Sequence, residues 1–117
     1  MQLNKTYQYK GRGTNKDIIN LIHQLTPKAA QQLKGSTILK MFEAPTVNET
    51  CYKIWSFLKN NIKYIPDTEA QQNVKMPSAL IREKKGDCKS YSLFTGAVLT
   101  NLGIPFKYAY TSYVPGN

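Results

Sequence analysis

The stretch Gly86–Pro105, GDCKSYSLFTGAVLTNLGIP, combines a helix start, an apolar helix and a helix stop in one continuous run. Asp87 is a residue type that favours the N-cap position, and Gly103 followed by Pro105 is a typical C-terminal signal. Apolar residues cover most of the circumference of the helix expected from Cys88 onward, as in a helix buried among other elements. The sequence therefore predicts a buried central helix whose first residue is a cysteine.

Cys88 stands where a thiolate would be stabilised. The N–H groups of a first helical turn are unpaired, and the helix dipole favours an anion there. Lysines at positions 84, 85 and 89 add positive charge. Gly86 would let the backbone turn tightly or approach a substrate, and the N–H groups could polarise a carbonyl. This pattern suits a nucleophile for acyl transfer, whereas a capped, semi-buried cysteine without reactivity is the alternative that the residues leave open.

Two helices are expected before residue 36. Thr14 with Asp17 three residues later opens the first, whose apolar residues recur at helical spacing. Thr26 and Pro27 form a cap followed by proline at the first helical position, so a second, short helix is expected to end at Gly35. His23 lies away from the apolar side of the first helix, at its edge or in solvent. The next residues, 36–42, fit either a helix or a strand.

A further helix is expected after residue 46, because Thr46 and Glu49 form a capping box ahead of an apolar stripe. Cys51 lies on that stripe, and we expect a buried, unreactive thiol packed beside Trp55. Residues 65–85 look like a loop with one short helical turn, a length that is uncommon in a compact domain unless the loop builds a site.

After the central helix, aromatic residues alternate between Pro105 and Val114, which predicts a strand. Gly96, inside the central helix, costs about 1 kcal/mol relative to alanine. This cost predicts that another backbone approaches the helix at that position.

Composition fits one globular domain of 117 residues, with no membrane span, no secretory signal and a cytoplasmic location by default. The net charge is +9, but the lysines are scattered, so binding to nucleic acid is not favoured. With two cysteines and one histidine the chain lacks the ligands of a zinc site, and neither a metal nor a cofactor is expected.

The run from Lys63 to Tyr113 resembles the core of the transglutaminase-like superfamily, in particular the papain-like cysteine peptidases of bacteria and their phages. The resemblance rests on YIPD, KMPSALI and GDCKSYSLFTGAVLTNLGIPF with the strand behind them, in the order of the family, over a little under half of the chain. It implies that Cys88 is the nucleophile, and that a histidine on the following strand and an aspartate or asparagine beyond it complete a triad.

The sequence departs from the family pattern after Tyr113, because it ends at Asn117 before a second histidine. His23 precedes the nucleophile and does not fit the pattern, so the chain is expected to be inactive by itself. By the same resemblance Gln72 is the preferred side-chain donor to an oxyanion, with Gln71 and Asn73 nearly as suitable. A solvent-facing loop amide is the alternative for Gln72.

Asp67 is expected to be a turn or cap residue, and Tyr64 a core residue.

Together these features predict an α+β fold: a helical lead at 1–45, then a core at 46–117 in which the Cys88 helix packs on a partial antiparallel sheet. The expected activity is thiol-dependent transfer or hydrolysis of peptide or amide bonds, with a peptide or protein as substrate. A basic module that binds nucleic acid or an acidic protein is the alternative. Since the strand at 105–114 would have an open edge, a homodimer through it is also expected.

Overall fold

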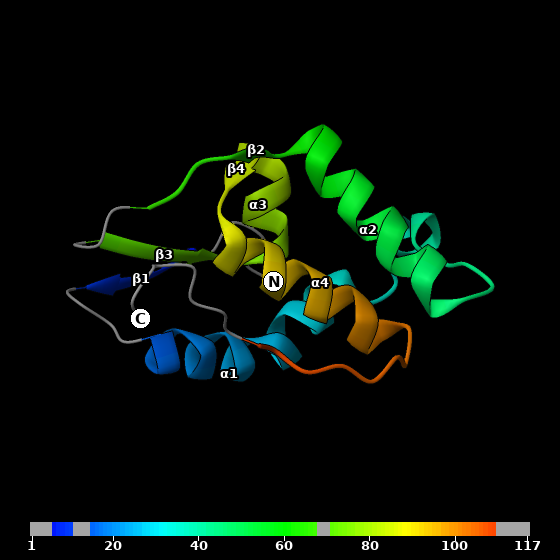
Figure 1. The fold of residues 1–117 in the computed structure, drawn as a ribbon, viewed down its shortest axis with the longest axis horizontal. Coiled ribbons are helices and arrows are strands. Elements are labelled where there is room, and N and C mark those ends of the chain that lie inside the picture. The colour runs from blue at the N-terminus through cyan, green and yellow to red at the C-terminus, as the bar shows by residue number, and fades with distance from the viewer. Residues whose placement is uncertain (1–5, 11–14, 68–70, 110–117) are drawn as a thin grey trace, which may run out of the picture.

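The computed structural model describes residues 6–10, 15–67 and 71–109, and the fold is α+β, as expected (Figure 1). In chain order the elements are β1 (Thr6–Lys10), α1 (Asn15–Leu33), the 3-10 helix η1 (Thr37–Met41), α2 (Val47–Asn61), β2 (Lys63–Tyr64), β3 (Gln71–Lys75), α3 (Pro77–Glu83), β4 (Lys85–Gly86) and α4 (Cys88–Asn101). None of the helices within the described ranges combines the length and the apolar character that crossing a membrane requires.

Two small sheets flank helix α4. β1 and β3 pair antiparallel, and β2 and β4 pair in parallel through hydrogen bonds from the Lys63 N–H to the Lys84 carbonyl and from the Ile65 N–H to the Gly86 carbonyl, both 2.8 Å. The interpretation of 65–85 as mostly loop is therefore wrong. Since β4 ends directly before α4, the β2–β4 pairing fixes the position of the first turn of α4.

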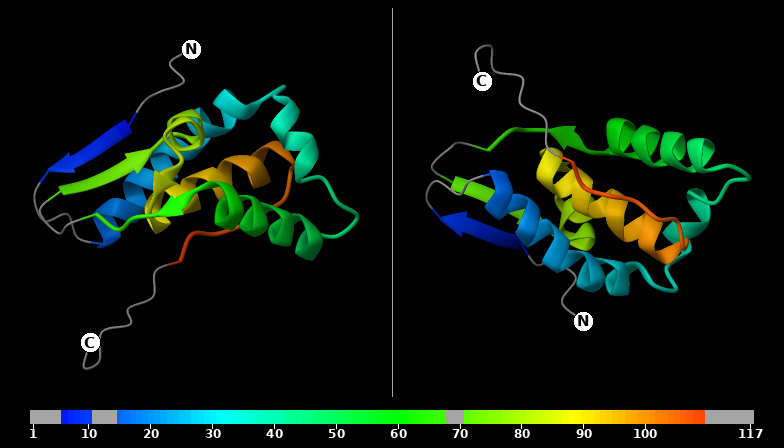
Figure 2. Two further views of the ribbon diagram at one scale, coloured as in Figure 1. Left: turned by 90° about the horizontal axis from the view of Figure 1, so that it is seen from above. Right: turned by 60° about the horizontal axis from the view of Figure 1, so that its bottom comes forward.

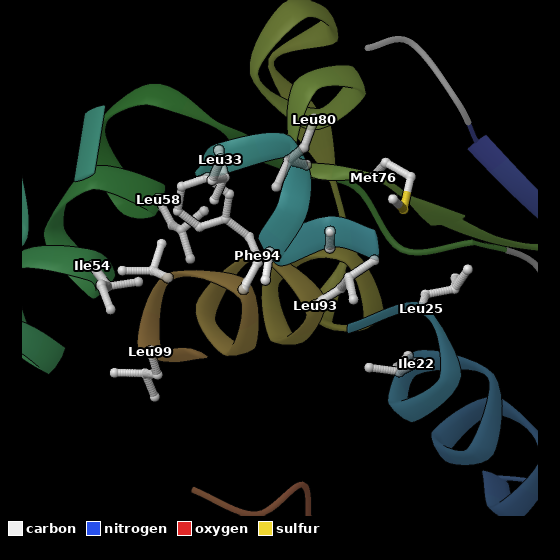
Figure 3. Close-up of a cluster of buried hydrophobic side chains, with 14 of the residues drawn as sticks. Ile22, Leu25, Leu33, Ile54, Leu58, Met76, Leu80, Leu93, Phe94 and Leu99 are labelled. Carbon is white, nitrogen blue, oxygen red and sulfur yellow. The ribbon is translucent and has the colours of Figure 1, made fainter. Parts of the chain in front are cut away.

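Helix α4 is the centre of the hydrophobic core, as its apolar circumference predicts. Leu93, Phe94, Ala97 and Val98 are fully buried, and side chains of α1, α2 and α3 converge on them (Figure 3). Phe94 lies against two further phenylalanine rings, Phe42 directly after η1 and Phe57 of α2, with centroids 5.9 and 5.6 Å away. Burial of one such ring contributes about 2–3 kcal/mol, so the core holds α4 firmly.

Both predicted ends of α4 are confirmed. The Asp87 carboxylate accepts from the Lys89 N–H at the N-cap, and Gly103 takes the left-handed backbone conformation just past the C-terminus. The reason for Gly96 is different from the one expected. A Cβ atom there would lie 1.9 Å from the Tyr108 hydroxyl oxygen and 3.1 Å from the Phe106 ring, so side chains rather than a backbone approach this position.

The segment 104–109 lies against α4 between α1 and α2, as Figure 2 shows. The Tyr108 hydroxyl lies 2.7 Å from that of Thr26 on α1. The strand expected at Pro105–Val114 is only partly within the described residues, and Pro105–Ala109 do not pair with another described strand.

Helix α1 is continuous from Asn15 to Leu33, so the prediction of two helices divided at Thr26 and Pro27 is wrong. Pro27 costs a helix about 3 kcal/mol because it lacks an N–H and crowds the preceding turn. The buried face of the helix runs without interruption from Ile22 to Leu33 across the proline and offsets that cost. The Thr26 hydroxyl does not cap a helix but donates to the Ile22 carbonyl at 2.8 Å.

Helix α2 begins as predicted, with the Thr46 hydroxyl accepting from the Glu49 N–H at 3.2 Å. The expectation for Cys51 and Trp55 is wrong, because Cys51 is exposed and Trp55 is 54% exposed. The helix carries two adjacent apolar stripes, and the core uses the one that contains Ile54 and Leu58. Residues 36–42, which fitted either state, form η1.

Candidate active site

Cys88 is the first residue of α4, and its side chain is exposed. It lies in a hollow of about 440 Å³ between α2, α4 and the segment after α4, which we call the Cys88 groove. Its lining includes Cys51, Trp55 and Leu58 of α2, Cys88, Ser92, Thr95 and Leu99 of α4, and Phe106–Ala109. The nucleophile predicted from the sequence is therefore accessible and stands in a concave, largely apolar surface.

The Asp87 carboxylate organises the turn below Cys88. It is 4% exposed, and it accepts from the Lys89 N–H at 3.1 Å and from the Lys89 ammonium. That ammonium also pairs with the Asp67 carboxylate at 3.4 Å. The expectation that Lys89 lends positive charge to Cys88 is wrong, because two carboxylates neutralise it.

Asp67 has a structural role, as the sequence suggested. Its carboxylate accepts from the Asn73 N–H at 2.7 Å, and its own N–H donates to Asp87 at 3.4 Å. These bonds connect the residues after β2 to β3 and to the cap of α4. The ring of contacts closes a polar hollow of about 400 Å³ that Cys88 does not line.

Gly86 is buried against the core and lines the polar hollow. A Cβ atom on Gly86 would lie 2.6 Å from Leu80 Cδ1, and Leu80 is itself fully buried. Its φ angle is not positive, so close packing explains the glycine better than a tight turn does. The expectation of a backbone that approaches a substrate at this position stays a prediction.

Tyr64 is a neighbour of Cys88 that the sequence did not identify, and the expectation that it belongs to the core is wrong because it is 53% exposed. Its ring meets the Tyr91 ring edge to face, with centroids 5.7 Å apart. Desolvation raises the pKa of Tyr64, the charge of Cys88 and hydrogen bonding with its side chain raise it further, and hydrogen bonding with the Cys88 backbone lowers it.

Tyr91 holds this arrangement from the next turn of α4. Its hydroxyl donates to the Ile62 carbonyl at 3.2 Å, at the end of α2, and burial followed by the Asp87 charge raises its pKa. Tyr64, Tyr91 and Cys88 thus form one cluster, produced by the β2–β4 pairing in which Tyr64 lies opposite Gly86.

The structure does not place the expected oxyanion amide at Cys88. Gln72 lies in β3, paired with Tyr9, rather than in a loop, and the side chains of Gln71 and Gln72 are outside the described residues. Asn73 is described, and it lines the polar hollow rather than the Cys88 groove.

His23 is exposed, as expected, and lies on α1 beside Tyr108, with ring centroids 6.4 Å apart. It lines a separate hollow between α1 and the segment 106–108. Within the described ranges, therefore, no histidine lines the Cys88 groove, and no group of potential ligands suited to a metal ion occurs.

The described elements make up an α+β protein in which an exposed cysteine opens a buried central helix. The family model of the transglutaminase-like superfamily matches residues 36–117, and the chain belongs to this superfamily. The match begins earlier than the resemblance at Lys63 and includes η1 and α2. Proteins of this superfamily share a fold that generally serves cysteine-dependent acyl transfer or peptide hydrolysis. No curated protein and no solved structure matches the chain.

Proposed function

We propose that Cys88 is the nucleophile of an acyl-transfer reaction on peptide or amide bonds, with hydrolysis as the outcome. The observation that carries this proposal is the position of the exposed thiol at the first residue of α4, inside a groove. Membership of the transglutaminase-like superfamily supports the same chemistry.

In the proposed reaction the Cys88 thiolate sulfur attacks the carbonyl carbon, and the carbonyl oxygen becomes an oxyanion. The Cys88 N–H donates to that oxygen. The C–N bond breaks, the amine leaves with a proton from a general acid, and water then hydrolyses the thioester. By family resemblance the acid is a histidine, which the described residues do not place in the groove.

The test compares the two cysteines of the same chain, because both are exposed and access alone does not separate them. Folded Cys51→Ser and Cys88→Ser variants each retain one of the two thiols. Each variant is treated with iodoacetamide at neutral pH, and mass spectrometry gives the labelling rate of its thiol. We expect Cys88 to react faster than Cys51, since a helix N-terminus stabilises the thiolate and α2 places Cys51 beyond its own first turn. Equal rates in the folded protein would contradict the proposal.

The rival reading is a basic binding module, which rests on the net charge of +9. It predicts retention of DNA that weakens steeply with salt. Retention of that kind, together with equal labelling of the two thiols, would favour the rival.

A further inference from the structure

We propose that the Cys88 groove binds an apolar, preferably aromatic, substrate side chain next to the scissile bond and rejects a cationic one. This inference rests on the proposed function of Cys88, and it assigns the substrate class through residues of α2 and α4.

The walls of the groove are built at helical spacing. Cys51, Trp55 and Leu58 follow one another at i, i+4 and i+7 along α2, and Cys88, Thr95 and Leu99 lie on the facing stripe of α4. Residues at these spacings share one side of a helix. A continuous surface therefore extends from the Cys88 sulfur along both helices. A substituent on a carbonyl group held at Cys88 would lie along this surface.

The exposed Trp55 indicates that this path is a binding surface. Cys51 and Trp55 are exposed although the next residue of this row, Leu58, is buried, and the indole is 54% exposed. Tyr52 lies 5.8 Å away, ring to ring, and the Lys59 ammonium lies 4.8 Å from the indole centroid. An aromatic residue held in place at the edge of a hollow supplies a rigid contact area for an apolar ligand.

Charge decides which side chains the groove accepts. Of the described residues that line it, Lys107 is the only charged one, and no carboxylate faces the space. A cationic side chain would meet a like charge and lose hydration without a partner, whereas an aromatic one would lose only unfavourable contact with water. The volume of about 440 Å³ falls in the range of about 300–1,000 Å³ that is typical of small-ligand sites.

The experiment uses affinity labels and does not require turnover. Native Cys51→Ser protein is treated with chloroacetamide and with its N-benzyl, N-aminoethyl and N-carboxymethyl derivatives, and the second-order rate of Cys88 labelling is measured for each. We expect the benzyl reagent to exceed chloroacetamide by about tenfold, because partial burial of a phenyl ring is worth about 1.4 kcal/mol. The cationic reagent is expected to be the slowest. Rates for model thiols correct for intrinsic reactivity.

Variants locate the preference in the groove. In the same background, Trp55→Ser removes a wall, and Thr95→Trp fills the groove two turns away from Cys88. Each is expected to abolish most of the benzyl preference, measured as the ratio of the benzyl rate to the chloroacetamide rate in the same variant. Met41→Ser and Thr100→Trp are matched controls at exposed positions outside the groove, and they should retain the preference.

The outcomes separate the two proposals. If chloroacetamide labels Cys88 no faster than Cys51, the proposed function fails. If Cys88 is reactive but all derivatives react alike, or the controls lose the preference together with Trp55→Ser, this inference alone is overturned.

Discussion

At the scale of single residues, the cap of α4 matters most, because one buried carboxylate serves both the helix and the charge of Lys89. Asp87 and Cys88 were predictable, since a cap and the residue after it are set by local sequence. Tyr64 was not predictable, because only the pairing of β2 with β4 brings it to Cys88. The prediction that Cys51 is buried was wrong because α2 has two adjacent apolar stripes. Tertiary packing decides which of them is buried.

Asp87→Ala should lower the free energy of unfolding by about 3 kcal/mol at neutral pH. The change removes the cap of α4 and one of the two carboxylates that neutralise the buried Lys89 ammonium. Asp87→Asn keeps an acceptor for the Lys89 N–H and should cost less. Urea unfolding of both variants measures the difference, and equal losses would show that the cap bond contributes nothing.

Tyr108 should make stability sensitive to alkaline pH. Burial raises the pKa of its hydroxyl, partly offset by the hydrogen bond with Thr26. A pKa raised in the folded state contributes stability below the unfolded value of about 10, and this contribution disappears as pH rises through the folded value. Urea midpoints measured between about pH 8 and pH 11 should fall less steeply for Tyr108→Phe than for the native chain. Parallel curves would contradict this assignment.

At the scale of elements, the helices were more predictable than the strands. The helices α2 and α4 have strong caps and long apolar patterns, and both begin where the sequence indicates. The strand β1, TYQYK, alternates tyrosine with polar residues but is only five residues long, and β3, QQNVK, is polar without alternation. They pair across a long sequence separation, which no local pattern reveals. Pro27 predicts a helix boundary because the cost of a proline inside a helix is visible in the sequence. The packing of α1 that offsets this cost is not visible there.

Gly96→Ala should destabilise the protein although alanine favours helices. The new Cβ atom would lie 1.9 Å from the Tyr108 hydroxyl oxygen and 2.8 Å from the adjacent ring carbon. Overpacking of this kind costs about 1–3 kcal/mol. In a Tyr108→Phe background the nearest atom is absent, so the cost of Gly96→Ala should be smaller. A double-mutant cycle in urea measures this coupling, and additivity within about 0.5 kcal/mol would refute the contact.

At the scale of the whole molecule, the family match and the folding unit have different boundaries. The match starts at residue 36, yet α1 ends at Leu33 and supplies a large part of the core around α4. The Asn101 side chain also donates to the Ala30 carbonyl at 2.8 Å. Helix α1, which packs against α4, therefore lies outside the residues that the family model matches. The homodimer through residues 105–114 stays a prediction.

A polypeptide of residues 36–117 should not fold cooperatively. It would expose the faces of α4 and α3 that Ile22, Leu25 and Leu33 cover, and small domains have little stability to spare. Thermal unfolding followed by circular dichroism should show no sharp transition for this fragment and a sharp one for residues 1–117. A cooperative transition in the fragment would show that α1 is dispensable.

The contact between the hydroxyls of Thr26 and Tyr108 joins two residues that are 82 positions apart in the sequence. During synthesis the ribosome releases residue 26 long before residue 108. Until then the segment 104–109 cannot lie in place, and the groove beside Cys88 lacks one of its walls. The order of translation therefore delays completion of the groove until residues 104–109 have emerged, so the Cys88 thiol is made before the groove around it is complete.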